Sequence, residues 1–404
     1  MSSVIPDGWG EHRQGDVADF SNGKAYKLTE WEKVGTPVIR LQNLTGSGKN
    51  YYYSNLKLPD RQYCESGDLL YMWSATFGPH IWKGPKAIYH YHIWKITCNE
   101  TDLTKRFLYQ LLGYKTAEWL NQSNGMGILH ITKGGMEELK LILPPLPEQQ
   151  KIAQILTSVD EVIEKTQAQI DKLKDLKTAM MQELLTKGIG HVEFKDTPVG
   201  RIPVGWGLTT LGEIGKWKGG GTPSKANESY WRGQIPWVSP KDVKVEYISK
   251  TKDSISMEAI LGSSTNLVEK GSLLIVVRSG ILQHTLPIAI ANCDLTINQD
   301  MKALTLSPNF CALYVYHYLL ANNHNVLRAT LKAGNTVESI DFAAFTTYQI
   351  PSPPLIEQVK IADAVESVAI NIRKKEQAMC SYKNMKKALM QDLLTGKVRV
   401  CVNE

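Results

Sequence analysis

The sequence predicts an α+β protein with a pseudo-two-fold internal repeat. Two domains are joined by a pair of long helices that form an antiparallel coiled coil. Three observations lead to this fold class. A segment of 43 residues occurs twice without a gap, the domain before each copy begins alike, and both copies have the apolar spacing of one long helix.

The repeated segment covers residues 144–186 and again 353–395, at a constant offset of 209, and 20 of its 43 positions are identical. Each copy opens with Pro-Pro, which favours an extended start. An acidic residue, Glu148 or Glu357, then suits the positive end of a helix, and no Pro or Gly follows before the copy ends. A helix over these 39 residues from Glu148 is roughly 58 Å long.

The apolar residues of each predicted helix form one stripe with steps of mostly three and four, broken at Thr166 and Lys375. A single helix of this length cannot bury its own stripe, so we expect the two helices to pair, most simply antiparallel. The alternative is that each stripe belongs to an ordinary domain core. The expected pairing residues are Ile152, Leu156, Val159, Ile163, Ile170 and Leu173, and Ile361, Val365, Val368, Ile372, Met379 and Tyr382.

Each helix follows a domain that opens with Ile-Pro-x-Gly-Trp, at residues 5–9 and again at 202–206. The predicted segments are a first domain at 1–143, a long helix and linker at 144–195, a second domain at 196–350, and a second long helix at 351–404. Inside the domains the sequences diverge. Short β-like runs occur at 36–41, 67–73, 235–238 and 271–278, and helical stretches near 104–121 and 310–330. This mixture predicts an α+β arrangement rather than regular strand–helix alternation.

Composition predicts a soluble globular protein, with 43% hydrophobic and 21% charged residues among 404. We expect no membrane span and no secretory signal. The six scattered cysteines favour reduced cytosolic thiols and argue against a zinc site. The predicted helices carry seven acids and five bases, and five acids and seven bases, so their charges cancel. The net charge of +6 therefore lies outside them, which suits a polyanionic partner.

Motifs for catalysis are weak in this sequence. Ser352-Pro353-Pro354-Leu355 has Leu where amino-group DNA methyltransferases carry an aromatic residue, so we interpret it as a helix start. The Gly125-Met126-Gly127 stretch lacks the third glycine of a dinucleotide fingerprint. The glycine-rich segment 219–225 lacks the order of a phosphate-binding loop and is either a turn that lets the backbone approach a ligand or a DNA phosphate contact. His90-Tyr91-His92 has metal-like spacing without a third ligand. We expect no catalytic residue and no metal ligand.

Residues suited to nucleic-acid binding are more numerous than catalytic motifs in this sequence. Arg, Lys, Asn and Gln can read base edges, and Ser, Thr and Tyr can hold phosphates, although any one of them can also be plain solvated surface. The DNA-binding candidates are Lys49, Tyr52, Lys83, Lys86, His130, Thr132, Lys133, Lys225, Lys241, Arg278, Ser279, Gln283, Asn335 and Thr336.

The repeated pattern resembles the specificity (S) subunit of Type I restriction–modification enzymes over essentially the whole chain. The resemblance rests on Pro-Pro-Leu-x-Glu-Gln at 144–149 and 353–358, the Ile-Ala that follows each, and Ile-Pro-x-Gly-Trp at the start of each domain. The second copy departs from the first at one position of this motif, with Ile356 in place of Pro147.

The resemblance implies that each domain is a target-recognition domain that reads one half of a bipartite, asymmetric site in double-stranded DNA. The helix pair would space the half-sites and dock two methyltransferase (M) subunits, which bind S-adenosylmethionine and methylate adenine. Two restriction (R) subunits can join such a core. The chain itself would bind no cofactor, catalyse nothing, and act in the cytoplasm in host defence by a restriction–modification system.

Physical reasoning agrees with this family, because antiparallel pairing of equivalent helices makes one chain imitate a C2 dimer. Such domains can reach one DNA face when half-sites lie about 34–36 Å, or roughly 10 base pairs, apart. Two rivals remain. A stand-alone methyltransferase or restriction fusion would need a cofactor-binding domain, and a pure coiled-coil assembly protein would use its domains to bind proteins.

Overall fold

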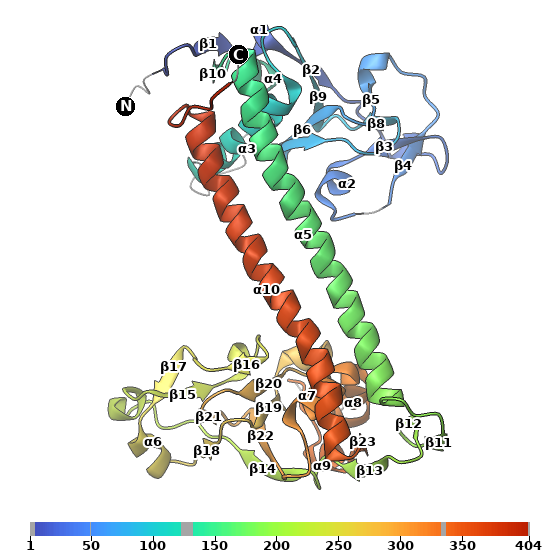
Figure 1. The fold of residues 1–404 in the computed structure, drawn as a ribbon, viewed down its shortest axis with the longest axis vertical. Helices are drawn as coiled ribbons and strands as arrows, with labels where there is room; N and C mark the ends of the chain where they lie inside the picture. The colour runs from blue at the N-terminus through green and yellow to red at the C-terminus, as the bar shows by residue number, and fades with distance from the viewer. Residues whose placement is uncertain (1–4, 49, 123–131, 333–336, 403–404) are drawn as a thin grey trace. The chain divides into compact units, whose positions relative to one another are not determined.

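The computed structural model describes residues 5–48, 50–122, 132–332 and 337–402. The chain forms two compact units. Unit 1 is Met1–Ala168 with Gln377–Glu404, and unit 2 is Gln169–Glu376. The long helices α5 (Leu146–Lys187) and α10 (Leu355–Leu394) both continue from one unit into the other (Figure 1). Each unit therefore contains one domain together with the start of one long helix and the end of the other.

Unit 1 contains two four-stranded sheets and a two-stranded pair. The first sheet, antiparallel throughout, has the order β2 (Ala18–Asn22), β9 (Ile93–Cys98), β6 (Leu69–Ser74), β7 (Thr76–Ile81). The second has the order β4 (Tyr52–Ser54), β3 (Thr36–Ile39), β8 (Ala87–Tyr89), β5 (Tyr63–Cys64), with β3 and β8 parallel. Strand β1 (Gly10–Arg13) pairs with β10 (Lys140–Leu143). Its helices are α1 (Gln14–Val17), α2 (Leu41–Thr45), α3 (Lys105–Gln122) and α4 (Lys133–Glu137).

Unit 2 repeats this plan with additions. One sheet has the order β14 (Gly215–Gly219), β22 (Met301–Leu306), β19 (Leu273–Val276), β20 (Ile288–Ala291), β16 (Tyr247–Ile248). The other has the order β17 (Asp253–Ile255), β15 (Ile235–Val238), β21 (Leu295–Ile297), β18 (Leu267–Val268), with β15 and β21 parallel. The pairs are β11 (Phe194–Thr197) with β12 (Gly200–Pro203), and β13 (Gly207–Thr210) with β23 (Gln349–Ser352). Its helices are α6 (Met257–Leu261), α7 (Ala312–Ala321), α8 (Asn323–Thr330) and α9 (Phe342–Thr347).

The shared strand order confirms the internal repeat and the α+β class, and it extends the repeat into domains whose sequences diverge. Gly23 and Gly220 meet the same packing requirement in the two domains, although the domain sequences differ. A Cβ on Gly23 would lie 2.3 Å from the carbonyl oxygen of Tyr89, and a Cβ on Gly220 would lie 2.1 Å from that of Ile297. Both glycines follow the first strand of their sheet and let it pass close to the central strand of the other sheet. In the glycine-rich segment 219–225, Gly220 thus allows a close approach between two strands, and the predicted approach of this segment to a ligand or to a DNA phosphate stays a prediction.

The elements that the sequence predicted lie within a few residues of their observed positions. The runs at 36–41, 235–238 and 271–278 contain β3, β15 and β19, and the run at 67–73 covers β6 except its last residue, Ser74. The helical stretch near 104–121 is α3, whereas the one near 310–330 is two helices, α7 and α8, which Asn322 separates. Among the described residues, no helix has the length and apolar character needed to cross a membrane.

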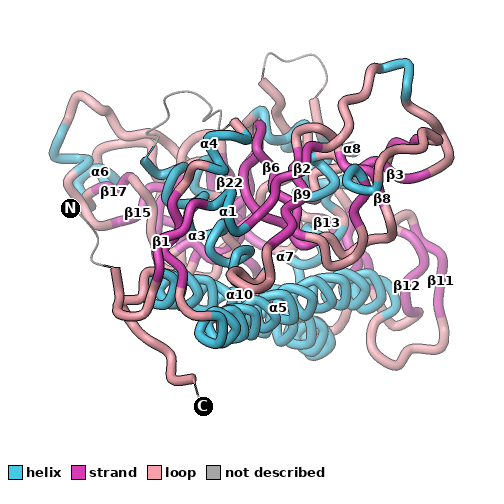
Figure 2. The backbone as a smooth tube through the Cα atoms, turned by 90° about the horizontal axis from the view of Figure 1, so that it is seen from above, coloured by secondary structure: helices cyan, strands magenta, loops and turns pink. Residues whose placement is uncertain are grey.

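The long helices pack antiparallel within each unit, side by side in both views (Figure 1; Figure 2). In unit 1, Ile152 and Leu156 near the start of α5 share a core with Leu393 and Leu394 at the end of α10. In unit 2, the reverse pairing brings Ile361 and Val365 of α10 together with Met181 and Leu185 of α5. Both clusters also contain residues of the adjoining domain, so each stripe serves helix pairing and domain core at once.

The predicted pairing residues differ in burial along the helices. Those near the helix starts are buried, and farther along the helices only Ile170 is buried while the others are partly so. Ile152, Leu156, Val159, Ile170, Ile361, Val365, Val368 and Ile372 are buried, whereas Ile163, Leu173, Met379 and Tyr382 are half-buried. Polar contacts replace apolar ones there: Lys375, one break in the stripe, donates to Gln169 Oε1 at 2.7 Å, and Lys174 pairs with Glu376 at 2.8 Å.

Candidate nucleic-acid interface

The glutamine of the repeated Glu-Gln pair fixes each domain to the start of its long helix. In unit 1, Gln149 Oε1 accepts from the backbone N–H of Thr104 at 3.0 Å, while Nε2 donates to the carbonyl oxygens of Asp102 and Pro144. Thr104 directly precedes α3, so one buried amide side chain joins the α3 start to the Pro-Pro turn.

Gln358 makes the same contacts in unit 2. Its Oε1 accepts from the N–H of Cys311 at 3.0 Å, directly before α7, and its Nε2 donates to the carbonyl oxygens of Asn309 and Pro353 at 3.2 and 2.8 Å. Three matching hydrogen bonds in both units explain why the sequence repeats Gln at this point.

The glutamate of the pair holds the repeated tryptophan. Glu148 Oε2 accepts from the indole of Trp9 at 3.2 Å, and both its oxygens accept from Arg399 at 2.8 Å. Glu357 Oε2 accepts from the indole of Trp206 at 2.9 Å. Arg399 follows α10, the long helix of the second repeat, and yet it lies in unit 1 with the first domain. The segment after each long helix therefore packs against the domain of the other repeat.

In unit 2 the closing segment is the linker after α5. Glu357 Oε1 accepts from the backbone N–H of Ile189 at 3.0 Å and hydrogen bonds to His191 Nε2 at 2.8 Å. Gly188 has φ of +67°, and a Cβ there would lie 2.7 Å from the Trp206 ring. A glycine is therefore required for the turn that places the linker against Trp206.

With its base fixed in this way, the domain of unit 1 presents an aromatic cluster formed by Tyr26, Trp31 and Tyr52. The Trp31 ring stacks on Tyr26 at 4.7 Å and packs against Tyr52 at 4.6 Å. The guanidinium of Arg40 lies 5.2 Å from the Tyr52 ring and 5.8 Å from the Trp31 ring. Tyr52 is 41% exposed, so the cluster is open to a ligand. Aromatic faces beside an arginine suit nucleic acid, since bases stack on rings and guanidinium groups bind phosphates and guanine edges.

The domain of unit 2 has a cavity at the matching place, with a volume of about 610 Å³. It is lined by Lys225, Glu228, Trp231, Arg232, Trp237, Ser239, Lys241 and Asp253. The rings of Trp231 and Trp237 meet edge to face at 5.2 Å, and Lys241 Nζ lies 2.8 Å from Asp253 Oδ2. The cavity thus combines aromatic walls with charged donors and acceptors.

Strand register shows that the two features occupy equivalent positions. Val38 of β3 pairs with Tyr52 of β4, and Trp237 of β15 pairs with Asp253 of β17. The residue after β3 is Arg40 and the residue after β15 is Ser239, one position beyond each strand. One scaffold therefore carries stacked aromatics with an arginine in unit 1, and tryptophans with a lysine–aspartate pair in unit 2.

Most other DNA-binding candidates lie at the surface in contacts within their own unit. Lys83 pairs with Glu164 of α5 at 2.9 Å, which ties the domain to the long helix. Lys86 lies 4.9 Å from the Tyr63 ring, and Lys133 pairs with Glu137 at 3.3 Å. The remaining placements are Thr132, which caps α4 through Gly135 N–H; Arg278, paired with Asp300 at 2.7 Å; Ser279, which caps the turn Gly280–Gln283; and Gln283, which donates to Glu338 at 2.7 Å.

The structure brings some candidates together and leaves others apart. Lys225 and Lys241 line one cavity, Arg278 and Ser279 line a second, and Lys241 and Ser279 line a third. Lys49, His130, Asn335 and Thr336 lie outside the described residues. Sequence reasoning missed Trp31 and Arg40. A tryptophan at a similar distance into each domain, Trp31 and Trp231, was the available signal.

His90 and His92 lie close together, with ring centroids 5.0 Å apart. Burial, with the positive charges of His92 and Arg40 nearby, lowers the pKa of His90 to about 4. Within the part of the chain that the structure describes, neither histidine belongs to a group of three potential metal ligands. Their surroundings are aromatic, since His90 also faces Trp31 at 6.4 Å. The pair extends the aromatic cluster.

Sequence comparison identifies two copies of the Type I restriction modification DNA specificity domain, at residues 6–175 and 203–378. The chain is 33% identical over 276 residues to the Type I restriction enzyme EcoR124I/EcoR124II specificity subunit of Escherichia coli, covering 67% of this chain and 64% of that relative. It is 25% identical over 413 residues to the Type I restriction enzyme MjaVIII specificity subunit of Methanocaldococcus jannaschii, covering 98% of this chain and 94% of the relative. This chain thus spans just under two thirds of the Escherichia coli relative and nearly all of the Methanocaldococcus jannaschii relative.

Solved structures share the fold. The S subunit of a Type I restriction–modification system from M. genitalium matches with a TM-score of 0.61 at 14% identity, covering 97% of this chain and 98% of that one. A chain from a structure that addresses complex assembly and conformational transition of the type I R-M system matches with a TM-score of 0.58 at 17% identity, covering 98% of this chain and all of that one. With two family domains over most of its length, the chain belongs to the Type I restriction–modification DNA specificity family.

Proposed function

We propose that this chain is the DNA sequence-specificity subunit of a Type I restriction–modification complex. Each domain reads one half of a bipartite, asymmetric site in double-stranded DNA. The observation that carries the proposal is the equivalent position of the Tyr26–Trp31–Tyr52 cluster with Arg40 and the Lys241–Asp253 cavity. One scaffold with different chemistry at the same place is what two different half-sites require.

The long helices supply the second part of the proposal. They fix the gap between half-sites and offer a surface to two methyltransferase subunits, to which two restriction subunits can be added. An antiparallel pair of equivalent helices presents similar surfaces to two copies of one partner. S-adenosylmethionine would be bound by the methyltransferase subunits, and methylation and cleavage would occur there and in the restriction subunits, in the cytoplasm. This chain would then act without catalysing a reaction itself.

Exchange of one domain tests this function. Residues 1–143 are replaced with the corresponding domain of another family member, and the complex with methyltransferase subunits is assayed by mapping methylated adenines. We expect one half-site to change and the other to persist. Matched exchange of residues 196–350 should change only the other half-site. A change in both half-sites after either exchange would contradict the modular function.

Two rival functions predict other outcomes. A stand-alone methyltransferase would transfer methyl groups to DNA as the purified chain alone. A coiled-coil assembly protein with protein-binding domains would leave the methyltransferase complex indifferent to DNA sequence. Sequence-specific duplex binding that requires both this chain and methyltransferase subunits would exclude both.

A further inference from the structure

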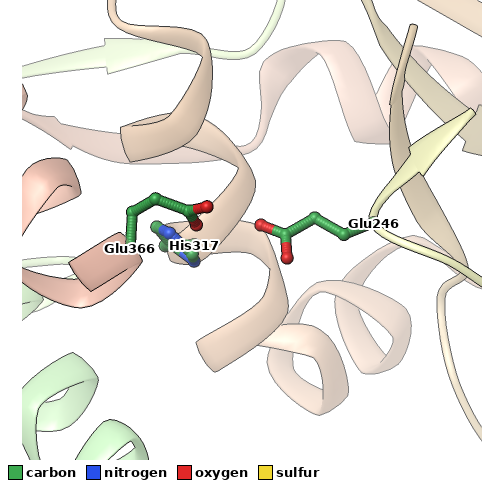
Figure 3. A group of neighbouring side chains, drawn as sticks. All are labelled: Glu246, His317 and Glu366. Carbon is green, nitrogen blue, oxygen red and sulfur yellow. The ribbon is translucent and has the colours of Figure 1, made fainter. Parts of the chain in front are cut away.

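Unit 2 contains a group of three potential ligands that the sequence did not reveal. Glu246 lies just before β16, His317 lies on α7 and Glu366 lies on α10 (Figure 3). One ligand atom from each residue lies within 4.8 Å of the other two. The three residues are far apart in the chain, so no spacing motif could have indicated them.

His317 is the central observation. Its side chain is fully buried, with 0% exposure, yet neither ring nitrogen has a hydrogen-bond partner. Buried polar atoms are nearly always paired, so an unpaired imidazole in a core needs an explanation. Oε1 of Glu246 and Oε2 of Glu366 also have no hydrogen-bond partner. The unpaired atoms therefore gather at one point, where the three side chains face one another (Figure 3).

Arg373 explains how the two carboxylates are held. It donates to Glu246 Oε2 at 3.0 Å and to Glu366 Oε1 at 2.5 Å, so each carboxylate uses one oxygen for Arg373 and keeps the other free. An outer donor that orients ligand carboxylates in this way is common around metal sites. Arg373 and Lys177, whose positive charge acts on both Glu246 and His317, balance the charge of the two carboxylates. The indication of a ligand therefore comes from the unpaired ring nitrogens and carboxylate oxygens, and not from surplus charge.

The other unit shows that the fold does not require these ligands. Gln358 binds the N–H of Cys311, and Gln149 binds that of Thr104, which aligns His317 with Gln110. Gln110 donates to Asp160 Oδ2 at 2.8 Å, and Lys386 pairs with the same carboxylate at 2.6 Å. A lysine–carboxylate–amide set thus occupies the corresponding place in unit 1.

We propose that Glu246, His317 and Glu366 bind a divalent first-row transition metal, with Zn²⁺ as the probe. One imidazole nitrogen and two carboxylate oxygens are a ligand set that such metals accept, with a water completing the coordination. Ligand atoms on a four-coordinate zinc lie about 3.4 Å apart, so the flexible glutamates would close by about 1 Å. The ion would join α10, α7 and the strand edge at β16, and so stabilise unit 2. This proposal does not depend on DNA recognition.

Two substitutions that copy unit 1 provide the test. His317→Gln introduces the residue found at Gln110, and Glu366→Thr introduces the one found at Thr157, 209 positions earlier in the repeat. Glu161→Gln, at an exposed acid of α5, is the matched control. The full-length chains are stripped with a chelator, dialysed against Zn²⁺, and analysed for bound metal and melting temperature.

We expect the unchanged chain and Glu161→Gln to retain one more Zn²⁺ per chain than either unit 2 variant. Zn²⁺ should raise the melting temperature by several degrees only in the first two. Co²⁺ should give visible absorption that both unit 2 variants lose, which separates this site from metal held by thiols. Circular dichroism before metal addition checks that each variant folds. If His317→Gln does not fold, the comparison with Glu366→Thr still tests the site.

Equal Zn²⁺ content and equal thermal shifts in all four chains would overturn the proposal. So would nitrogen NMR showing that His317 stays doubly protonated at neutral pH with Zn²⁺ present, because a protonated ring bridging the two carboxylates cannot bind a metal.

Discussion

The carboxylate of Glu357 accepts a hydrogen bond from the indole nitrogen of Trp206 at 2.9 Å, although 151 positions separate the two residues in the chain. Glu148 and Trp9 make the same contact across 139 positions. Two motifs that the sequence repeats independently therefore meet in space, once in each unit. The bond joins the residue just before β1 or β13 to the start of the long helix that follows its domain.

Removing the Glu357 carboxylate should destabilise unit 2 in a pH-dependent way. Burial alone would raise the pKa of Glu357, but donation from Ile189 N–H, Trp206 and His191 outweighs burial, so its pKa falls below 4.5. The ionised group therefore stabilises the fold above about pH 4.5, and this contribution is lost as pH falls through the lowered value. We expect Glu357→Gln to cost about 1.5–3 kcal/mol at pH 7 and less at pH 3.5. Urea unfolding at both pH values measures the difference.

Glu193→Gln is the control, because Glu193 is an exposed acid of the same unit. Its unfolding free energy should match that of the unchanged chain at both pH values. A Glu357→Gln deficit that stays constant between pH 7 and 3.5 would contradict the ionised role of Glu357.

Replacing Gln358 with leucine should also destabilise unit 2, without pH dependence. The amide N–H of Cys311 would lose its acceptor, and the carbonyl of Pro353 would lose its donor. Unpaired buried groups of this kind cost about 1–3 kcal/mol. Gln377→Leu, at an exposed position of α10, should change the free energy of unfolding by less than about 0.5 kcal/mol. Equal effects from the two substitutions would show that Gln358 is not a specific anchor.

Arg40→Ala and Lys241→Ala should each weaken recognition of a different half-site. Both residues lie at equivalent edges of their domains, beside aromatic rings. In the methyltransferase complex, we expect each substitution to lower affinity by about 1–3 kcal/mol and to relax discrimination only in the half-site read by its own domain. Binding to duplexes altered in one half-site at a time measures this. A uniform loss over all sequences with a smaller salt dependence would instead identify a phosphate contact.

Lengthening the helix pair should change the gap between half-sites while preserving their sequences. The end of α5 is unsuited to an insertion, because Met181 and Leu185 are buried in the core of unit 2. The stretch around Leu176, which is 47% exposed, is a better place. Four residues inserted after Asp175, matched by four after Arg373, add about 6 Å and keep Lys174 with Glu376 and Gln169 with Lys375.

That length corresponds to between one and two base pairs at about 3.4 Å each. Methylation mapping should show the longer gap with both half-sites intact. The same gap after the paired insertions would refute the role of the helices as a spacer. Insertion in α5 alone is the informative control, since it shifts α5 against α10 in one of the two cores and should destabilise the chain.

The sequence by itself determined the repeat, the two long helices and their antiparallel pairing. These features depend on local periodicity, and a stripe such as Ile152–Leu156 needs a partner of matching length wherever the chain places it. The sequence also singled out Glu148, Gln149, Trp9 and their repeats, though without showing that they bind one another. Short apolar runs indicated the positions of β3, β6, β15 and β19. They did not indicate the common sheet order, because that order depends on contacts between strands that are distant in the sequence.

Only the tertiary structure decided which side chains meet. Tyr26, Trp31, Arg40 and Tyr52 come from separate loops and strands, so composition identified Tyr52 alone as a candidate. Lysines such as Lys83 and Lys133 looked equally available in the sequence, yet each pairs with a nearby acid once folded. His317 became a potential metal ligand only when α7 and α10 brought it within 4.8 Å of two glutamates. The physical reason is the same throughout: helix periodicity is encoded locally, whereas a binding site depends on long-range packing that brings distant residues to one point.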